Sequence, residues 1–282
     1  MQIQNGDTTL NVETAGDETA PTLLLLHGIT SSRHTWEWFV PTLCSRYHVL
    51  SLDFRGHGIS GRAPGGYQLA GYVTDVVAVL EGLASAPALV VGHSLGGVTA
   101  AALAQRRPEL VRAMVLEDPP LAVVSVDGDV ADSPIFDAFR LMKATVPGVQ
   151  AAGMPANAVA QMMAMMPTAT GVPMGQVIFA EALVAMAAGL LEVDIAVLDP
   201  ILDGTAESAF DPAQPIPVPT LILTGDPAMP DTVAIAAHVE PVLAASPLVA
   251  QHAVIGAGHQ IHDTIASRGE FVREVESFLA RF

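Results

Sequence analysis

The chain has 282 residues, of which 51% are apolar and 15% are charged, and this composition excludes an intrinsically disordered protein. The length suits one α/β domain with an inserted subdomain and a core large enough to need no covalent staples. Twelve basic residues against 29 acidic ones give a net charge of −17, which repels nucleic acids and anionic membranes, so we expect neither as a partner.

Several features bear on the compartment. The only cysteine, Cys44, excludes an intrachain disulfide and a thiolate metal cluster, which favours a reducing environment. Residues 1–20 lack the basic head and apolar run of a signal peptide, so we expect a soluble, cytoplasmic protein. Residues 144–180 carry no charge, a length that would suffice for a membrane span. Four prolines and four glycines punctuate this stretch, so we expect short helices over buried apolar surface instead.

Short apolar segments alternate with helical periodicity from residue 22 onward. Strands are predicted at residues 22–26, 48–52, 88–91, 111–116, 220–224 and 252–255. Helices are predicted at residues 69–83, 95–105 and 271–282, where apolar residues recur at helical spacing. Residues 1–14 are typical of a hairpin that turns at Asn5-Gly6. The alternation predicts a mostly parallel, doubly wound α/β sheet with helices on both faces.

Residues 121–215 interrupt this alternation and differ in composition. They hold eight of the eleven methionines and eleven acidic residues, but only two basic ones, Arg140 and Lys143. We predict that residues 1–120 and 216–282 form the core and that residues 121–215 form an inserted helical cap. Because the insertion lies between two strands, the cap would cover the carboxyl edge of the sheet, where ligands bind in open α/β folds. The proline-rich segment 211–219 would return the chain to the core.

The strongest local signal is Gly92-His93-Ser94-Leu95-Gly96, between a predicted strand and a predicted helix. This G-x-S-x-G pattern is typical of a sharp turn that holds a serine nucleophile clear of a sheet. The backbone at the turn is strained, and the positions two before and two after the serine lie too close for side chains. The pattern therefore indicates Ser94 as a nucleophile beside the free N–H groups of a helix terminus.

A serine nucleophile needs a base, and the base needs a carboxylate to orient it. In this kind of sheet the three follow the chain order Ser, Asp or Glu, His. Asp226 follows the predicted strand at residues 220–224, and His259 follows the last predicted strand. We predict Asp226 as the orienting carboxylate and His259 as the base. Asp118 also ends a predicted strand and is the alternative carboxylate.

Taken together, these motifs resemble the α/β-hydrolase fold superfamily along the whole chain. The matching segments are His27-Gly28, the turn Asp53-Phe54-Arg55-Gly56-His57-Gly58, the Ser94 turn, Gly225-Asp226 and Gly258-His259. The resemblance implies that Ser94, Asp226 and His259 form a catalytic triad. It also implies an oxyanion hole made by the backbone N–H groups of Ile29 and Leu95. One such donor typically lowers the reaction barrier by about 3 kcal/mol.

Other histidines have structural interpretations. We interpret His27 and His57 as hydrogen-bonding residues, and His93 as packing behind the nucleophile. His262 follows His259 by three residues but does not follow a strand directly. No His-Glu pair has zinc-ligand spacing, and no nucleotide-binding glycine motif is present, so neither a metal nor a cofactor is expected.

Serine at the turn disfavours epoxide hydrolysis and dehalogenation, because relatives with those activities use aspartate there. We expect acyl transfer to water, with an ester or lactone of a small, neutral, hydrophobic molecule as substrate. Two alternatives are kept. One is a carbon–carbon bond hydrolase acting on ring-fission products, which would have to bind an anionic substrate. The other is a low-turnover receptor for a small ligand on the same fold.

The expected substrate contacts include cap methionines and a few residues of the core. Methionine side chains would provide a soft apolar lining for the site, or they would simply pack the cap onto the core. The residues proposed to border the substrate are Thr30, Trp36, Met154, Met162 and Met229. The sequence does not indicate an oligomeric state.

Overall fold

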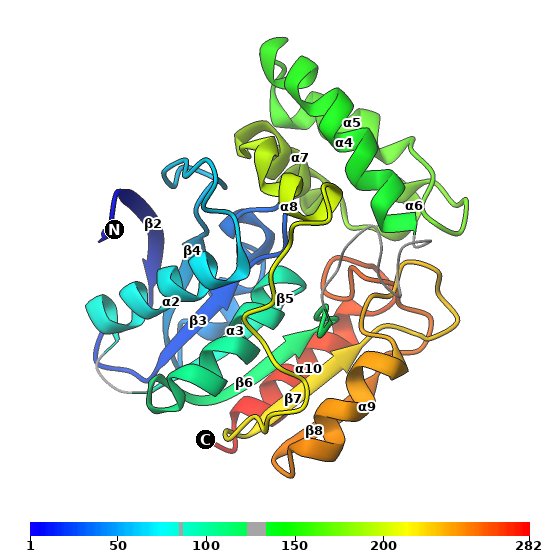
Figure 1. Ribbon diagram of the computed structural model, residues 1–282. Helices are drawn as coiled ribbons and strands as arrows, with labels where there is room; N and C mark the ends of the chain where they lie inside the picture. Colours follow the sequence, from blue (N-terminus) through cyan, green and yellow to red (C-terminus); the bar gives the residue numbers. More distant parts are fainter. Residues whose placement is uncertain (85–86, 123–133) are drawn as a thin grey trace.

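The computed structural model describes residues 1–84, 87–122 and 134–282, and an eight-stranded sheet lies at its centre (Figure 1). The strands are β1 (Gln2–Asn5), β2 (Thr8–Ala15), β3 (Thr22–Leu26), β4 (His48–Asp53), β5 (Ala88–His93), β6 (Val111–Glu117), β7 (Thr220–Thr224) and β8 (Val249–Ala253). Their order across the sheet is β1-β2-β4-β3-β5-β6-β7-β8. The pairs β1–β2 and β2–β4 are antiparallel and the others are parallel, which confirms the predicted sheet.

Helices cover both faces of this sheet. The core helices are α1 (Val40–Leu43), α2 (Leu69–Leu83), α3 (Leu95–Arg106), α9 (Ala236–Ala245) and α10 (Arg268–Leu279). Helices α2, α3 and α9 pack on one face, and α1 and α10 pack on the other. Short 3₁₀ turns lie at Arg33–Trp36, Pro108–Leu110 and Ile195–Leu198.

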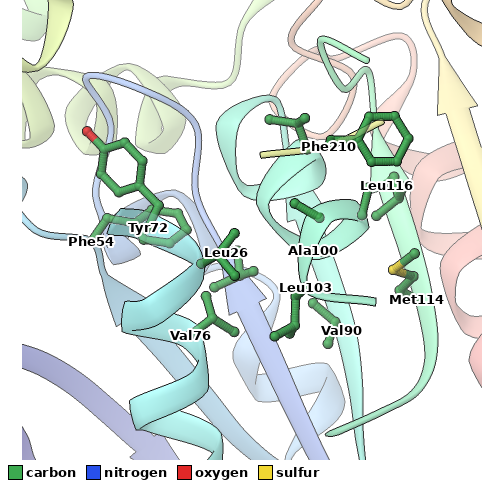
Figure 2. Close-up of a cluster of buried hydrophobic side chains, with 14 of the residues drawn as sticks. Leu26, Phe54, Tyr72, Val76, Val90, Ala100, Leu103, Met114, Leu116 and Phe210 are labelled. Atoms are coloured by element: carbon green, nitrogen blue, oxygen red, sulfur yellow. The ribbon is translucent and has the colours of Figure 1, made fainter. Parts of the chain in front are cut away.

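Strand β3 shows why the sheet has two apolar faces. Successive side chains of a strand point to opposite sides. Leu24 and Leu26 therefore join one buried cluster, and Leu23 and Leu25 join the other. Figure 2 shows part of the first cluster, with Leu26 near side chains from α2 and α3. A wholly apolar strand is thus the signature of burial on both faces, as the sequence predicts.

The last strand differs from its prediction. Strand β8 covers Val249–Ala253 rather than residues 252–255. It is an edge strand that is only partly buried, so polar Gln251 and His252 interrupt the apolar run used to locate it. Ile255, inside the predicted range, is 75% exposed.

A group of helices is inserted between β6 and β7. These are α4 (Pro134–Ala151), α5 (Ala156–Ala164), α6 (Met174–Val177), α7 (Ala180–Glu192) and α8 (Asp199–Leu202). They gather at the end of the sheet toward which the arrows of β6 and β7 point (Figure 1). Parts of α5 and α7 form a separate small apolar cluster that includes Val159 and Leu183. The boundaries 121 and 215 themselves stay a prediction, and residues 123–133 lie outside the described residues.

The charge-free stretch forms the short helices that were expected. It spans the second half of α4, all of α5 and α6, and the turns between them. Pro147 does not end α4, which continues to Ala151. Across the described residues, no helix is both long enough and apolar enough to cross a membrane.

The segment 203–219 returns the chain to β7 without a regular helix or strand and lies along α3. The Gln105 side chain donates to the backbone carbonyls of Asp211 and Gln214 at 2.8 and 2.9 Å. The side chain of Phe210 is 4% exposed and belongs to the same apolar cluster as Leu116 (Figure 2). This segment is therefore packed into the core.

Candidate active site

The turn between β5 and α3 holds Ser94 in a strained conformation. Its backbone has φ 51° and ψ −113°, a region that residues other than glycine rarely adopt. A β-carbon on Gly92 would lie 2.5 Å from the carbonyl carbon of Gly96, and one on Gly96 would lie 2.4 Å from the carbonyl oxygen of Leu26. The turn therefore requires glycine at both positions, as the sequence predicts.

This crowding makes Gly96 sensitive to one methyl group. We expect Gly96→Ala to lower the free energy of unfolding by about 2–4 kcal/mol, because the backbones of β3 and α3 would have to separate. Gly148 is the matched control, since it lies inside α4 and, apart from adjacent residues and the backbone of its own helix, no atom lies within 4 Å of the position that its β-carbon would take. Gly148→Ala should be neutral or stabilising by about 0.5–1 kcal/mol. Urea unfolding of both variants measures the difference, and equal stabilities would contradict the steric argument.

The imidazole of His259 is held by a carboxylate from another strand end. Its Nδ1 lies 2.6 Å from Oδ2 of Asp118, the residue after β6. Asp118 is completely buried and also accepts hydrogen bonds from the backbone N–H groups of Gly225, Val233 and Ala234. A carboxylate only accepts hydrogen bonds, so the proton of His259 lies on Nδ1 and Nε2 is left as the basic nitrogen.

The carboxylate that contacts His259 is thus not Asp226, as was predicted, but the alternative. Asp226 follows β7 as expected, yet its two oxygens accept from the backbone N–H groups of Ala228 and Gly256, each at 2.8 Å. These hydrogen bonds hold the pKa of Asp226 below its ordinary value. Its own N–H donates to the carbonyl of Ala257 at 2.7 Å, so Asp226 ties the loop after β7 to the loop that carries His259.

Ser94 and His259 are both nearly buried, with 6% and 8% of their surfaces exposed. Within the described residues, the hydroxyl of Ser94 makes no hydrogen bond, and neither does Nε2 of His259. Beneath them, Nε2–H of His93 donates to the backbone carbonyl of His259 at 3.0 Å. Burial lowers the pKa of His93 well below its ordinary value, so this ring is a neutral support for the base, as its structural interpretation predicts.

The two N–H groups assigned to the oxyanion hole lie at adjacent strand ends. Leu95 is the first residue of α3, and Ile29 follows β3, the strand beside β5. In the described part of the chain, neither N–H has a hydrogen-bond partner, so both are free to donate. A hydrogen bond holds the loop that contains Ile29, because the N–H of Thr30 donates to Nε2 of His57 at 3.2 Å.

Two buried histidines support that loop. Nε2 of His27 accepts from the N–H of Phe54 at 3.1 Å, and Nδ1–H of His57 donates to the carbonyl of Arg55 at 2.9 Å. Burial lowers the pKa of both histidines. This confirms their interpretation as structural hydrogen-bonding residues.

Backbone strain is concentrated at this edge of the sheet. Among the described residues, three that are not glycine have positive φ: Thr30 at 62°, Ser94 at 51° and Asp118 at 39°. Each lies in the loop that follows β3, β5 or β6, which are neighbours in the sheet. Such strain persists only where surrounding structure enforces it, and it is typical of functional sites.

His262 occupies a separate buried network. Its Nδ1 lies 2.7 Å from Oε2 of Glu117, and its Nε2 lies 2.8 Å from the hydroxyl of Thr35. Burial opposes the charged form, but the neighbouring Asp263 and Glu117 outweigh it and raise the pKa of His262. Fully buried and fully bonded, His262 anchors the loop of His259 and is not available as a base.

Most of the residues that were predicted to contact the substrate do not lie together in the structure. Trp36 is fully buried in the core, stacked on His262 with ring centroids 4.4 Å apart, so its placement beside a substrate was wrong. Met162 is 54% exposed on α5, and Met154 packs in the small apolar cluster of the insertion. Neither of these two methionines lines the cavity described next: Met162 faces solvent, and Met154 packs against other residues of the insertion.

A cavity of about 270 Å³ lies between the insertion and the loops that follow β7 and β8. Gly258 and Gln260, which flank His259, line it, whereas Ser94 and His259 themselves do not. Its lining residues are Thr168, Ala169, Thr170, Gln176, Val177, Ile178, Met229, Asp231, Gly256, Gly258, Gln260, Thr264, Ile265 and Ala266. Of the predicted contacts, Met229 alone is in this lining. The sequence analysis did not identify Asp231, Gln176 or the threonines of the lining as candidates. Asp231 lies in the same loop as Asp226, between β7 and α9.

The insertion is joined to the loop of His259 along one side of this cavity. Ile178 forms a β-bridge with Thr264, and the N–H of Phe179 donates to the carbonyl of Asp263 at 3.1 Å. Residues 1–84, 87–122 and 134–282 contain no group of three or more His, Cys, Asp and Glu side chains arranged to hold a metal ion. The groups that this edge offers for chemistry are a serine, a histidine and a carboxylate.

Comparison with known proteins places these features in context. Among curated proteins, 2-(acetamidomethylene)succinate hydrolase of Mesorhizobium japonicum is 36% identical over 117 residues, which cover 42% of this chain and 41% of that protein. A serine hydrolase-like protein of Danio rerio is 37% identical over 98 residues, which cover 34% of this chain and 30% of that protein. The matches thus span less than half the length of these relatives.

Solved structures match over nearly the whole chain. The crystal structure of E-2-(acetamidomethylene)succinate hydrolase has a TM-score of 0.73 at 23% identity, covering 99% of this chain and 98% of its own. The enol-lactonase from Burkholderia xenovorans LB400 has a TM-score of 0.73 at 22% identity, covering 99% and 100%. A family model described as alpha/beta hydrolase fold matches residues 21–264. The chain therefore belongs to the α/β-hydrolase fold family.

Proposed function

We propose that the protein hydrolyses an ester or lactone through an acyl-enzyme intermediate on Ser94. The observation that carries this proposal is the hydrogen bond of 2.6 Å between Nδ1 of His259 and Oδ2 of Asp118, which follows β6, the neighbour of the strand β5 that leads to Ser94. It fixes the proton on Nδ1 and leaves Nε2 to act on the serine.

The proposed reaction has two halves. Nε2 of His259 takes the proton of Ser94 as the serine oxygen bonds to the substrate carbonyl carbon, and the N–H groups of Ile29 and Leu95 stabilise the resulting oxyanion. The tetrahedral intermediate collapses, and the departing alcohol takes the proton from His259. A water molecule then attacks the acyl group by the same sequence and releases the acid and Ser94.

Charge around the site supports an ester or lactone over the carbon–carbon alternative. The cavity next to the loop of His259 has no Lys or Arg among its described lining residues, so an anionic group that entered it would meet no cation. The basic residues of the insertion are engaged elsewhere: Arg140 pairs with Asp137, and Lys143 pairs with Asp199. The reacting carbonyl of an ester or lactone is neutral and requires no such cation.

Covalent labelling tests the proposal directly. A fluorophosphonate should react with Ser94, and mass spectrometry of the digested protein should locate the adduct on the peptide that contains it. The unlabelled protein should also hydrolyse p-nitrophenyl esters of short and medium chain length, and labelling should abolish that activity in proportion to occupancy. No adduct and no hydrolysis would favour the receptor alternative.

A further inference from the structure

Asp231 lies in the loop between β7 and α9, and its carboxylate is pressed against the backbone of Gly258, the residue before His259. A β-carbon on Gly258 would lie 2.3 Å from Oδ1 and 2.5 Å from Oδ2 of Asp231. Glycine at this position therefore lets a carboxylate sit one residue away from the proposed base. Asp231 also lines the cavity of about 270 Å³.

This carboxylate has no hydrogen-bond partner within the described residues. Its Oδ1 is buried, yet no donor of the described chain reaches it. The two other aspartates of this edge are satisfied differently, because Asp118 and Asp226 each accept backbone N–H groups. Buried carboxylate oxygens are normally hydrogen-bonded, and Asp231 is also a lining residue of the cavity, so its carboxylate has unused capacity to accept a donor that enters there.

The surroundings indicate which donor fits. Among the described residues of the cavity lining, Asp231 is the one charged side chain, and Gln176 and Gln260 add neutral acceptors. Arg268, whose neighbour Asp263 is in the loop of His259, is engaged elsewhere, since it pairs with Glu181 and donates to the carbonyl of His262. The net charge of −17 further attracts cations toward the molecule.

The residues that line the cavity also indicate which kind of cationic group it would bind. Quaternary ammonium groups are usually bound by aromatic faces, and the described lining contains no aromatic residue. A protonated amine instead presents N–H donors, which carboxylate and amide oxygens accept. The cavity therefore suits a protonated amine better than a quaternary ammonium group.

We propose that Asp231 is a specificity-determining residue that binds an ammonium group, so that the substrates are esters or lactones carrying a protonated amine. This inference rests on the proposed hydrolytic function and adds a substrate class to it. It replaces the neutral, hydrophobic substrate expected from sequence.

Three p-nitrophenyl esters of matched chain length test it: the 6-aminohexanoate, the heptanoate and the monoadipate, which are cationic, neutral and anionic. We expect the wild-type protein to show a kcat/KM for the cationic ester at least about tenfold above that for the neutral ester, with the anionic ester lowest. In Asp231→Asn, the cationic-to-neutral ratio should fall toward one and the anionic-to-neutral ratio should rise. A loss of folding alone would lower all three rates and leave the ratios unchanged.

Asp203→Asn serves as the control for net charge, because Asp203 is exposed at the end of α8 and does not line the cavity. Its ratios should match those of the wild type. A wild-type protein that hydrolyses the heptanoate but shows no preference for the cationic ester would overturn the inference, as would a preference that survives in Asp231→Asn. If the protein hydrolyses none of the three esters and Ser94 does not react with the fluorophosphonate, the proposed function is overturned, and the inference with it.

Discussion

Replacing Asp118 with asparagine should lower kcat for ester hydrolysis by about 10³–10⁴-fold, whereas Asp226→Asn should lower it less than about tenfold. The amide introduced by Asp118→Asn can present its N–H₂ group to Nδ1 of His259, which favours the tautomer with the proton on Nε2. That tautomer cannot accept the proton of Ser94. Steady-state hydrolysis of a p-nitrophenyl ester at neutral pH measures the effect.

The Asp226→Asn variant is the matched control, because it makes the same chemical change in a neighbouring loop. The Asp226 side chain accepts two backbone N–H groups, so weakening these hydrogen bonds should appear as a lower melting temperature. Thermal unfolding of both variants separates this effect from catalysis. A larger loss of kcat in Asp226→Asn than in Asp118→Asn would show that the contact of 2.6 Å is not the one used in turnover.

Ser94→Ala should lower kcat by about 10⁵–10⁶-fold while leaving the melting temperature within a few degrees of the wild type. The stability expectation follows from the absence of any hydrogen bond to the Ser94 hydroxyl within the described residues. Removing an unbonded hydroxyl leaves no buried group unsatisfied. Ester hydrolysis and calorimetry on the same preparation measure the two quantities.

Ser60→Ala is the control for Ser94→Ala, because it should reduce stability and leave the activity nearly unchanged. The Ser60 hydroxyl donates to the carbonyl of Asp53 and accepts from the N–H of Asn11, so its removal should cost stability but little activity. If Ser94→Ala retained a substantial part of the wild-type kcat, Ser94 would not be the nucleophile, whatever its stability.

Patterns that depend on local sterics were predictable from the sequence. The strands β3 and β7 were located to the residue because buried parallel strands are continuous apolar runs. The requirement for Gly92 and Gly96 follows from the geometry of one sharp turn, which the local sequence determines. These features need no knowledge of what lies on the other side of the sheet.

The choice between Asp118 and Asp226 could not be made in the same way. Both follow parallel strands that are neighbours in the sheet, so both are candidates by position. The outcome depends on which loop backbone offers N–H groups to which carboxylate: Val233 and Ala234 hold Asp118, and Gly256 holds Asp226. Those donors come from distant parts of the chain, and no short pattern encodes them.

Amphipathic and aromatic residues were misplaced for a related reason. Trp36 was expected to border the substrate, yet its ring stacks on those of His262 and Phe271. The methionines Met162, Met165 and Met166 are 54%, 78% and 42% exposed, although their composition suggested a lining. Hydrophobicity indicates that a side chain prefers burial, but it does not say against which neighbour.

The path of residues 203–219 affects how the entrance to this site can be redesigned. Phe210 fills part of the core and Gln105 anchors the backbone around it, so the chain between the last inserted helix and β7 packs against the sheet and its helices. Swapping or shortening the helices above the site without disturbing the scaffold therefore means rejoining the chain after Leu202, ahead of this stretch. A graft made at residue 215 would remove an aromatic side chain from the interior and open a void beneath α3.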